Sequence, residues 1–326
     1  MTVVEWLKNM IHLTETHSAI AKTTKKCTLD RPCRDGSGSY GSARTWCKSE
    51  CGRCHENVVR ALIELGAKVD VEDKWKWTPL HRAAIWCHVN IVRALIQLGA
   101  KVDAQDKNEE TPLHRAAAWG HENIVRALIE LGVNVDAENY IQKKSLHYAS
   151  INGHVNVVRA LIELGAKVDA VERYYQQTPL HYAAENDHVN VIPALIELGA
   201  TVDAKNKDKK TPLHRAAIKG QKDVVRTLIK HGANVDAETN DKETPLHFLA
   251  KCGNVDALRT LIELGANVNA EDTHKRTSLH DAAYWESEKI VPALIELGAN
   301  VNAEDADKHT HLVKKPKEEA GVQNSV

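Results

Sequence analysis

Apolar and polar residues follow a fixed pattern along most of this chain, and each unit of the pattern has two parts. Between Thr111 and Ala137, the short segment L-H-R-A-A-A-W is followed by N-I-V-R-A-L-I-E-L, whose apolar residues recur every three or four positions. That spacing predicts two consecutive helices, each with an apolar stripe. Thr111 is the expected N-cap, and Gly120 is expected to end the first helix because glycine readily adopts the conformation of a helix stop.

The same two-part pattern is repeated along the chain. Its marker is T-P-L-H, with variants at Lys144 and Thr277. The marker histidines are His81, His114, His147, His181, His214, His247 and His280, spaced by 33 residues except for one gap of 34. A period in this range is typical of a stacked array, in which neighbouring repeats bury the apolar face that one repeat cannot bury alone.

The repeat carries the pattern T-P-L-H-x-A-A-x-x-G-H-x-x-V-V-x-x-L-I-x-x-G-A-x-V-x-A. Through this pattern, from about Cys54 to Asp305, the chain resembles the ankyrin-repeat family. The resemblance implies an all-α fold with short β-hairpin fingers, a solenoid of helix-turn-helix units. It also implies that each marker histidine links neighbouring repeats, and that fingertips and first helices bind proteins on a concave face. We expect an N-terminal helix plus a Cys/Gly/Ser-rich irregular segment over 1–44. We expect an ankyrin-repeat domain of about eight repeats, the first of them degenerate, over 45–305. A disordered C-terminal tail is expected over 306–326.

Two departures from the family pattern concern the fingers. The family has glycine two residues before the marker threonine, but none stands there in this chain. The residues at that position are Lys76, Glu109, Gln142, Gln176, Lys209, Lys242, Lys275 and Lys308. Because a left-handed residue other than glycine costs about 1–2 kcal/mol, we expect another turn type or mobile fingers. The 34-residue gap places one extra residue in the finger over 171–177.

Bulk composition narrows the function. The chain is 43% hydrophobic and 27% charged, with a formal net charge of −1 and a pI of about 7.0. This balance argues against a nucleic-acid partner, which would require a basic excess. No apolar run approaches the ~20 residues that span a bilayer, and the N-terminus lacks the features of a secretory signal. We expect a monomeric protein in the cytoplasm, with the nucleus as the alternative.

The histidines and charged pairs follow the repeat and so favour structural roles. Of the 18 histidines, seven occupy the marker position and five the turn between the two helices. A catalytic site would not recur with the period, so we expect no enzymatic activity and no cofactor. The second helices carry Arg and Glu four residues apart, which predicts ion pairs along one helix. These pairs are Arg60/Glu64, Arg126/Glu130, Arg159/Glu163 and Arg259/Glu263.

A cysteine cluster interrupts the first repeat. Cys47, Cys51, Cys54 and His55 could in principle hold a zinc ion, but no second well-spaced C-x-x-C exists and five clustered cysteines are an odd number for disulfides. The spacing therefore favours no role. Reactive or paired thiols, and a reading-frame error over 27–54, remain alternatives.

The aromatic residues depart from the period and are the candidate partner-binding residues. They occupy fingers (Trp75, Trp77, Tyr140, Tyr174 and Tyr175) and the ends of first helices (Trp86, Trp119, Tyr284 and Trp285). Trp and Tyr are enriched at binding hot spots, although these side chains could instead pack on neighbouring fingers. The sequence predicts a non-enzymatic protein-interaction scaffold with a protein partner. A secreted or delivered effector acting in a host cell, and a regulatory fragment of a larger enzyme or channel, are the alternatives.

Overall fold

The computed structural model describes residues 57, 59–61, 63, 64 and 67–310. It divides into two compact halves, Met1–Tyr174 and Tyr175–Val326, which we call the N-terminal and C-terminal halves. The division falls inside the finger that carries the extra residue. The zinc candidates Cys47, Cys51, Cys54 and His55 lie outside the described residues, as do 1–44 and 311–326.

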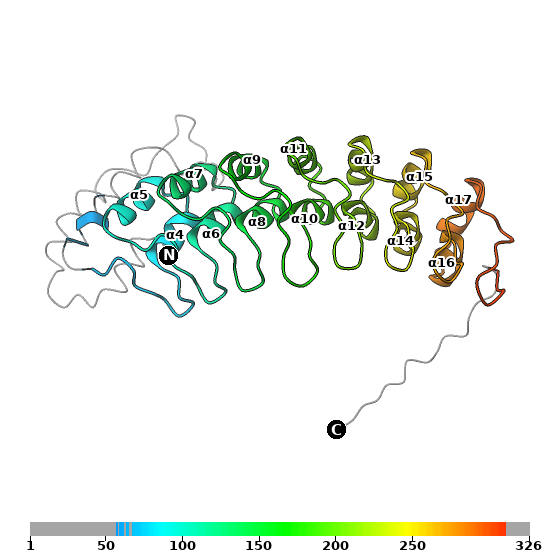
Figure 1. The fold of residues 1–326 in the computed structure, drawn as a ribbon, viewed down its shortest axis with the longest axis horizontal. Helices are drawn as coiled ribbons and strands as arrows, with labels where there is room; N and C mark the ends of the chain where they lie inside the picture. Colours follow the sequence, from blue (N-terminus) through cyan, green and yellow to red (C-terminus); the bar gives the residue numbers. More distant parts are fainter. Residues whose placement is uncertain (1–56, 58, 62, 65–66, 311–326) are drawn as a thin grey trace, which may run out of the picture. The chain divides into compact units, whose positions relative to one another are not determined.

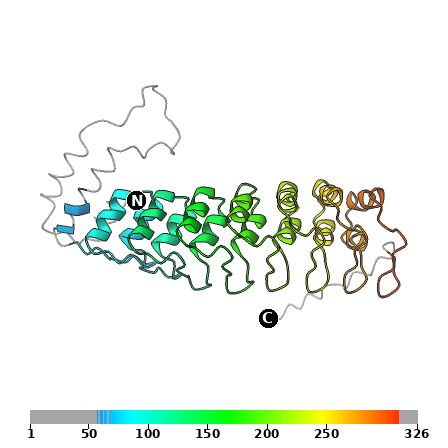
Figure 2. The ribbon, with the colours of Figure 1, turned by 45° about the horizontal axis from the view of Figure 1, so that its top comes forward.

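In the N-terminal half, each repeat contributes a short first helix and a longer second helix. The first helices form one row and the second helices form another, and the fingers project from the row of first helices (Figures 1 and 2). The first helices are α4 (Pro79–Ile85), α6 (Pro112–Ala118) and α8 (Ser145–Ile151); the second are α5 (Val89–Gln97), α7 (Glu122–Glu130) and α9 (Val155–Glu163). The described residues between 57 and 64 are also helical, in the predicted second helix of the degenerate repeat.

The C-terminal half repeats this arrangement. Its first helices are α10 (Pro179–Glu185), α12 (Pro212–Lys219), α14 (Pro245–Cys252) and α16 (Ser278–Tyr284). Its second helices are α11 (Val191–Glu197), α13 (Lys222–Lys230), α15 (Val255–Glu263) and α17 (Ile290–Glu296). α11 and α17 are shorter than α15 because Pro193 and Pro292 lack the N–H that would bond to the carbonyl four residues earlier.

The core of each repeat is formed by the predicted apolar stripes. In one repeat Leu113, Ala117, Val125 and Leu128 are completely buried. Burying a leucine or valine contributes about 1.5–3 kcal/mol, and the alanines let adjacent helices approach closely. The predicted helix-turn-helix fold is therefore confirmed, with Thr111 as the N-cap and Pro112 in the first turn.

The marker histidines connect consecutive repeats, as the family resemblance implies. The N–H of Thr111 donates to Nδ1 of His114 at 3.1 Å, and Nε2 of His114 lies 3.1 Å from the carbonyl oxygen of Lys143 in the next finger. Because Nδ1 accepts, Nε2 must carry the proton and the ring must be neutral. His81, His181, His214, His247 and His280 make the equivalent contact with a carbonyl 29 residues later.

A second contact between repeats occurs at the turn between the two helices. Nε2 of His121 lies 2.7 Å from the carbonyl oxygen of Ile85, and Nε2 of His154 lies 3.1 Å from that of Ala118. In the C-terminal half, the amides of Gln221 and Asn254 take this role. The periodic turn histidines of the N-terminal half therefore have a structural function.

The fingers turn through a left-handed residue, so the expectation of another turn type is wrong. Lys76, Glu109, Gln142, Gln176, Lys209, Lys242, Lys275 and Lys308 all have φ between 55° and 61°. An earlier polar side chain holds the turn. Oδ1 of Asp106 accepts from the N–H groups of Asn108 at 2.7 Å and Glu110 at 3.0 Å. These bonds offset the cost of the left-handed residue.

The extra residue is accommodated without loss of the turn. Glu172 follows Asp106 by two periods of 33 residues and takes its place. Its buried side chain accepts from the N–H of Tyr174, two residues later, at 2.7 Å, as Asp106 accepts from Asn108. Residues 306–310, assigned from sequence to the disordered tail, instead complete a last finger. Its residues Glu304 and Thr310 form the isolated β-bridge found among the described residues.

Arg126 and Arg259 pair with glutamates of the next repeat rather than with Glu130 and Glu263, which corrects the predicted partners. Arg126 pairs with Glu163 at 2.8 Å, and Arg259 pairs with Glu296 at 2.6 Å; each partner lies 37 residues later, one repeat plus about one helical turn. Arg126 also pairs with Glu122 of its own helix. Since the side chains are well exposed, each pair contributes only about 0–1 kcal/mol.

Gly120 should be much less replaceable than Gly99, although both have positive φ. A Cβ on Gly120 would lie 2.7 Å from Nδ1 of His154, whereas nothing lies within 4 Å of one on Gly99. The His154 ring cannot move without losing its bond to Ala118. We expect Gly120→Ala to cost roughly 3 kcal/mol and Gly99→Ala about 1 kcal/mol, measured by urea unfolding. Equal losses of stability in the two variants would contradict the close approach of His154 to Gly120.

Stability should fall in acid because the marker histidines are buried neutral. Burial lowers the pKa of His114 and of His214 to about 4, from 6.5. The unfolded chain therefore binds protons first, so this stabilisation is complete above pH ~6.5 and is lost as pH falls towards ~4, roughly 3 kcal/mol for each histidine. Burial raises the pKa of Asp281, which acts in the opposite direction but is a single group.

Urea unfolding at several pH values checks this expectation. The variant His214→Gln has no proton to gain at that position, so its stability deficit relative to the wild type should narrow as pH falls from about 7 to about 4.5. A constant deficit, or a wild-type stability that stays level over this range, would show that the buried histidines do not control acid unfolding.

Candidate protein-binding surface

The candidate aromatic residues are exposed, with one exception. In the N-terminal half, Trp75, Trp86, Trp119, Tyr140 and Tyr174 are 49–59% exposed; in the C-terminal half, Tyr175, Tyr284 and Trp285 are 59–66% exposed. Trp77 is the exception, since it is only partly exposed. The exposed fraction of the side chain therefore separates Trp77 from the other predicted partner-binding residues.

Trp86 and Trp119 occupy the same position in consecutive repeats. Each is the C-cap residue of its first helix, and its N–H donates to the carbonyl of an arginine one turn earlier. Because α4 and α6 pack directly against each other, at a typical axial distance of about 8–10 Å, the two residues stand at neighbouring positions on the row of first helices. Their backbone is fixed by helices, which limits the entropy lost on binding.

Trp75 is a further exposed aromatic residue of this half, on a finger. Its ring centroid lies 6.4 Å from that of Trp77, and the Lys74 ammonium lies 4.1 Å from its centroid. Its carbonyl accepts from the N–H of Lys107 in the next finger. The finger is therefore tied to its neighbour while the indole of Trp75 stays half exposed.

Trp77 is a structural residue at the base of the same finger. Its Nε1–H donates to Asp106 at 3.0 Å, and the guanidinium groups of Arg82 and Arg115 lie 4.5 and 4.8 Å from its ring centroid. Such cation–π contacts contribute about 0.5–2 kcal/mol. Because these contacts use its polar atom and its ring, we remove Trp77 from the proposed contact surface.

An ionic network surrounds Trp77. Arg82 pairs with Asp73 at 2.8 Å, and Arg115 pairs with Asp106 and with Glu110. Burial alone would raise the pKa of the Asp106 carboxyl, but hydrogen bonds from Arg115 and from backbone amides outweigh it and lower that pKa. The carboxylate stays charged, so the network ties each finger to the first helix of its own repeat and to its neighbour.

The C-terminal half carries a related network that the sequence did not reveal. The ammonium groups of Lys210 and Lys251 lie 5.2 and 5.3 Å from the ring centroid of Phe248, and Lys251 pairs with Glu243 and Asp281. Phe248 stands where Arg82 and Arg115 stand in the N-terminal half. The signal was this shared position in the repeat, directly after the marker histidine, which holds an arginine or an aromatic residue in every repeat from Arg82 to Phe248 and an aspartate, Asp281, in the last.

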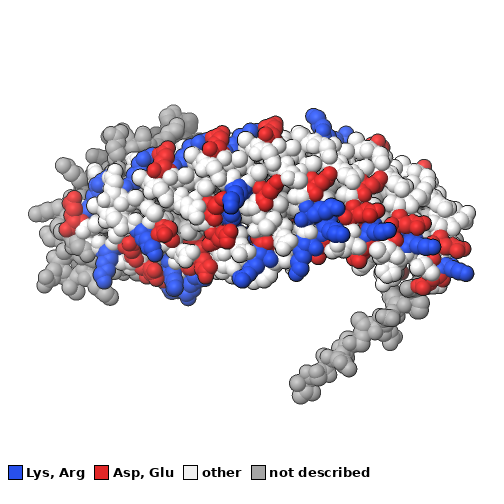
Figure 3. Space-filling view, viewed as in Figure 1, with Lys and Arg blue, Asp and Glu red and all other residues white. Residues whose placement is uncertain are grey.

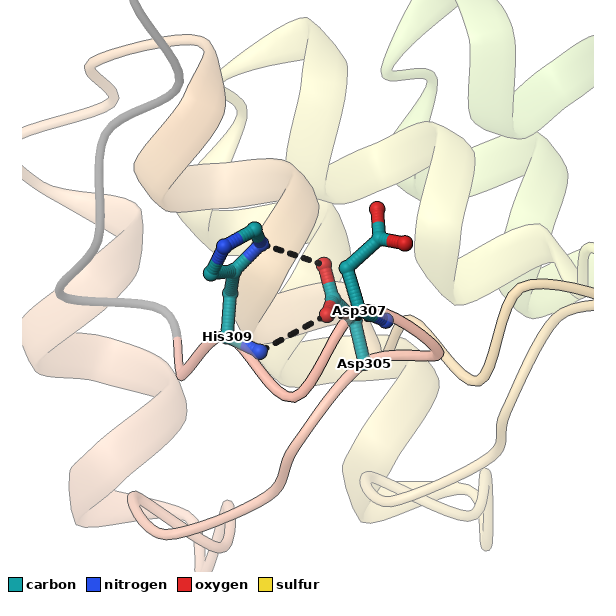
Figure 4. Close-up of side chains that lie close together, drawn as sticks. All are labelled: Asp305, Asp307 and His309. Carbon is teal, nitrogen blue, oxygen red and sulfur yellow. Dashed lines mark hydrogen bonds and ion pairs between the residues drawn. The ribbon is translucent and has the colours of Figure 1, made fainter.

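One group of possible metal ligands occurs among the described residues. Carboxylate and ring atoms of Asp305, Asp307 and His309 lie within 4.8 Å of one another (Figure 4). However, Oδ1 of Asp305 accepts from the N–H groups of Asp307 and His309, both at 2.9 Å. This is the hydrogen bonding that holds the other fingers, so a structural role accounts for the Asp305 carboxylate.

Charged side chains are mixed in sign. On the molecular face in Figure 3, Lys and Arg are interspersed with Asp and Glu over both helices and fingers. A phosphate-binding surface would gather cations into a continuous patch. Besides these charged residues, the fingers and first helices expose the uncharged aromatic side chains described above.

Comparison with known proteins agrees with this geometry. The family model for ankyrin repeats matches residues 47–106, 98–172, 146–239 and 232–305. The chain belongs to the ankyrin-repeat family. Its repeats resemble those of the human ASB11 ankyrin repeat domain, with 32% identity, a TM-score of 0.58 and coverage of 64% of this chain and 93% of that one.

The ankyrin repeat domain of Bcl-3, described as a unique member of the IkappaB protein family, is a second similar structure. It shares 28% identity with a TM-score of 0.59, over 67% of this chain and 98% of that one. No curated protein sequence matches this chain. Ankyrin repeats are generally protein–protein interaction modules. Within the described residues, no helix of this ankyrin-repeat protein is both long and apolar enough to cross a bilayer.

Trp77 and Trp75 should differ sharply on substitution. Trp77→Ala removes the ring between two arginines and leaves Asp106 without its indole donor, so we expect a loss of about 3 kcal/mol. Trp75→Ala, on the half-exposed ring two residues away, should cost less than about 1 kcal/mol. Urea unfolding of both variants measures this difference, and a similar cost for both would refute the structural role of Trp77.

Proposed function

We propose that this ankyrin-repeat protein is a non-enzymatic scaffold that binds a protein partner through its fingers and first helices. In the N-terminal half, Trp75, Trp86, Trp119 and Tyr140 make the contact on what we take to be the concave face. The main observation in favour of this surface is that the indoles of Trp86 and Trp119 are half exposed at equivalent positions on adjacent helices.

The contrast between the two helix rows supports this choice of surface. The second helices α5, α7 and α9 contain no aromatic residue and carry paired Arg and Glu side chains. Trp and Tyr are enriched, and charged residues depleted, at the centres of protein interfaces. The row of first helices therefore has the composition of an interface, and the row of second helices that of a solvated surface.

The ionic network around Trp77 supports it further. Arg82 and Arg115 are held by Asp73, Asp106 and Glu110, so the base of the finger that carries Trp75 is already ordered. Binding would therefore cost little side-chain freedom at that base, which favours affinity. Tyr174, Tyr175 and Trp285 are exposed on the same kinds of position, and we propose them as secondary contacts. We propose the cytoplasm as the compartment, with the nucleus as the alternative.

Affinity capture with quantitative mass spectrometry tests the proposed surface. We expect the triple variant Trp75→Ala, Trp86→Ala and Trp119→Ala to lose most of a specific partner that the wild type captures. Each such anchor contributes more than about 1–2 kcal/mol, so removal of three should weaken binding by at least about a hundredfold.

The matched control is a triple variant in the other row of helices: Arg93→Ala, Arg126→Ala and Glu163→Ala. These side chains are 36–51% exposed, comparable with the tryptophans. The control should retain the partner, and circular dichroism should show both variants equally helical. Partner capture that survives loss of the tryptophans, or fails equally in the control, would reject this surface.

A further inference from the structure

The backbone on both sides of Trp86 is held in place. Its N–H donates to the carbonyl of Arg82 at 3.2 Å, and the carbonyl of the preceding residue, Ile85, lies 2.7 Å from Nε2 of His121 in the next repeat. The equivalent bonds hold Trp119. The first helices α4 and α6 lie next to each other in one row (Figure 2). The backbones of the two tryptophans are therefore about 8–10 Å apart, the usual distance between packed helices.

This spacing matches the repeat of one chain conformation. In polyproline II, each residue rises about 3.1 Å, so every third residue faces the same side at intervals of about 9.3 Å. In an extended strand, residues on one side recur at about 6.8 Å. In an α-helix, they recur at about 5.4 Å for each turn and about 10.5 Å for residues seven apart. Polyproline II is the conformation whose repeat falls within the spacing of the tryptophans.

The indole N–H groups favour the same conformation. Trp77 donates its Nε1–H to Asp106 at 3.0 Å, whereas no described residue accepts from the indole of Trp86 or Trp119. Because an indole only donates, a partner must supply acceptors. The carbonyls of a polyproline II segment can accept, since this conformation has no internal hydrogen bonds, and proline brings no N–H of its own. An α-helix uses most of its carbonyls internally.

The charges near the two tryptophans suit an uncharged segment. Arg82 and Arg115 are the residues of α4 and α6 with a permanent charge, and both are already paired in the network around Trp77. An acidic or basic segment would therefore meet no unpaired opposite charge on these helices. A proline-rich segment loses nothing by this, because its backbone and rings carry no charge.

We propose that the protein partner binds through a proline-rich segment in the polyproline II conformation, with residues three apart seated on Trp86 and Trp119. This inference rests on the proposed function and adds the class of partner. Proline fixes φ close to its polyproline II value, so such a segment is ordered before it binds and loses little backbone entropy. Proline-rich segments dock on aromatic side chains in this manner in several kinds of recognition domain.

Indole ¹H–¹⁵N spectra of the ¹⁵N-labelled full chain, titrated with decaproline, test the proposal. The seven tryptophans give seven indole signals, which single Trp→Phe substitutions assign. The signals of Trp86 and Trp119 should shift together and saturate at one dissociation constant. Trp285 is the internal control, because it holds the same position in the C-terminal half but follows Gly253 in its row. A Gly/Ser peptide of ten residues should shift none of these signals.

Two variants with opposite expected effects measure the contribution of the indoles. Trp119→Ala should weaken the binding of fluorescent decaproline at least about tenfold, since one of two anchors is lost. Asn152→Trp places a third indole at the exposed C-cap of α8, the next equivalent position in the row, and should tighten binding about fivefold or more. Trp86 and Trp119 show that this position accepts tryptophan. Fluorescence anisotropy measures both, and circular dichroism should show both variants folded.

Several outcomes would reject the proline-rich class. They are no decaproline binding up to about 1 mM, shifts as large at Trp285 as at Trp86 and Trp119, and an Asn152→Trp variant that binds no more tightly than the wild type. If a partner is captured through Trp75, Trp86 and Trp119 while decaproline does not bind, the proposed function stands and only the class of partner is wrong. If decaproline binds as expected and also displaces that partner, both proposals are supported.

Discussion

The hydrogen bonds of the buried marker histidine are the constraint on which the rest of the structure depends. In His114, Nδ1 accepts from the start of its own helix and Nε2 donates to the next finger, so one ring sets both the cap and the repeat-to-repeat register. The ring can do this only in one neutral tautomer. The finger that accepts this hydrogen bond must then present the Lys143 carbonyl, and the left-handed turn held by Asn139 keeps that finger in one conformation.

Periodicity predicts the features that each repeat makes from its own residues. The apolar stripe, the Thr111 cap and the stop at Gly120 all depend on spacings of a few residues, and the helices follow from them. It also predicts that repeats must stack, because no repeat can bury its stripe alone. The absence of glycine does not predict the left-handed fingers, because side chains such as Asp106 compensate for it through hydrogen bonds to backbone amides.

Contacts between repeats account for the remaining differences. Arg126 could pair with Glu130 in its own helix, but Glu163 of the next repeat lies closer to its guanidinium. Trp77 and Trp75 look alike in sequence, yet only Trp77 meets Asp106 and Arg115, about one repeat later. Partners separated by about 29 to 38 residues are invisible to a pattern of helix periodicity. The same limitation concealed the role of Phe248 between Lys210 and Lys251.

The aromatic residues therefore belong to three physical classes rather than one. Trp77 stabilises the base of a finger, Tyr284 stands at a position that is only partly exposed in most earlier repeats, and Trp86 and Trp119 are exposed at a position that stacking leaves open. Only residues of the last class can vary without disturbing either the core or the register. A fold built from local repeats thus separates stability from recognition: side chains that face the next repeat are constrained, and those at the ends of first helices are free to specify a partner.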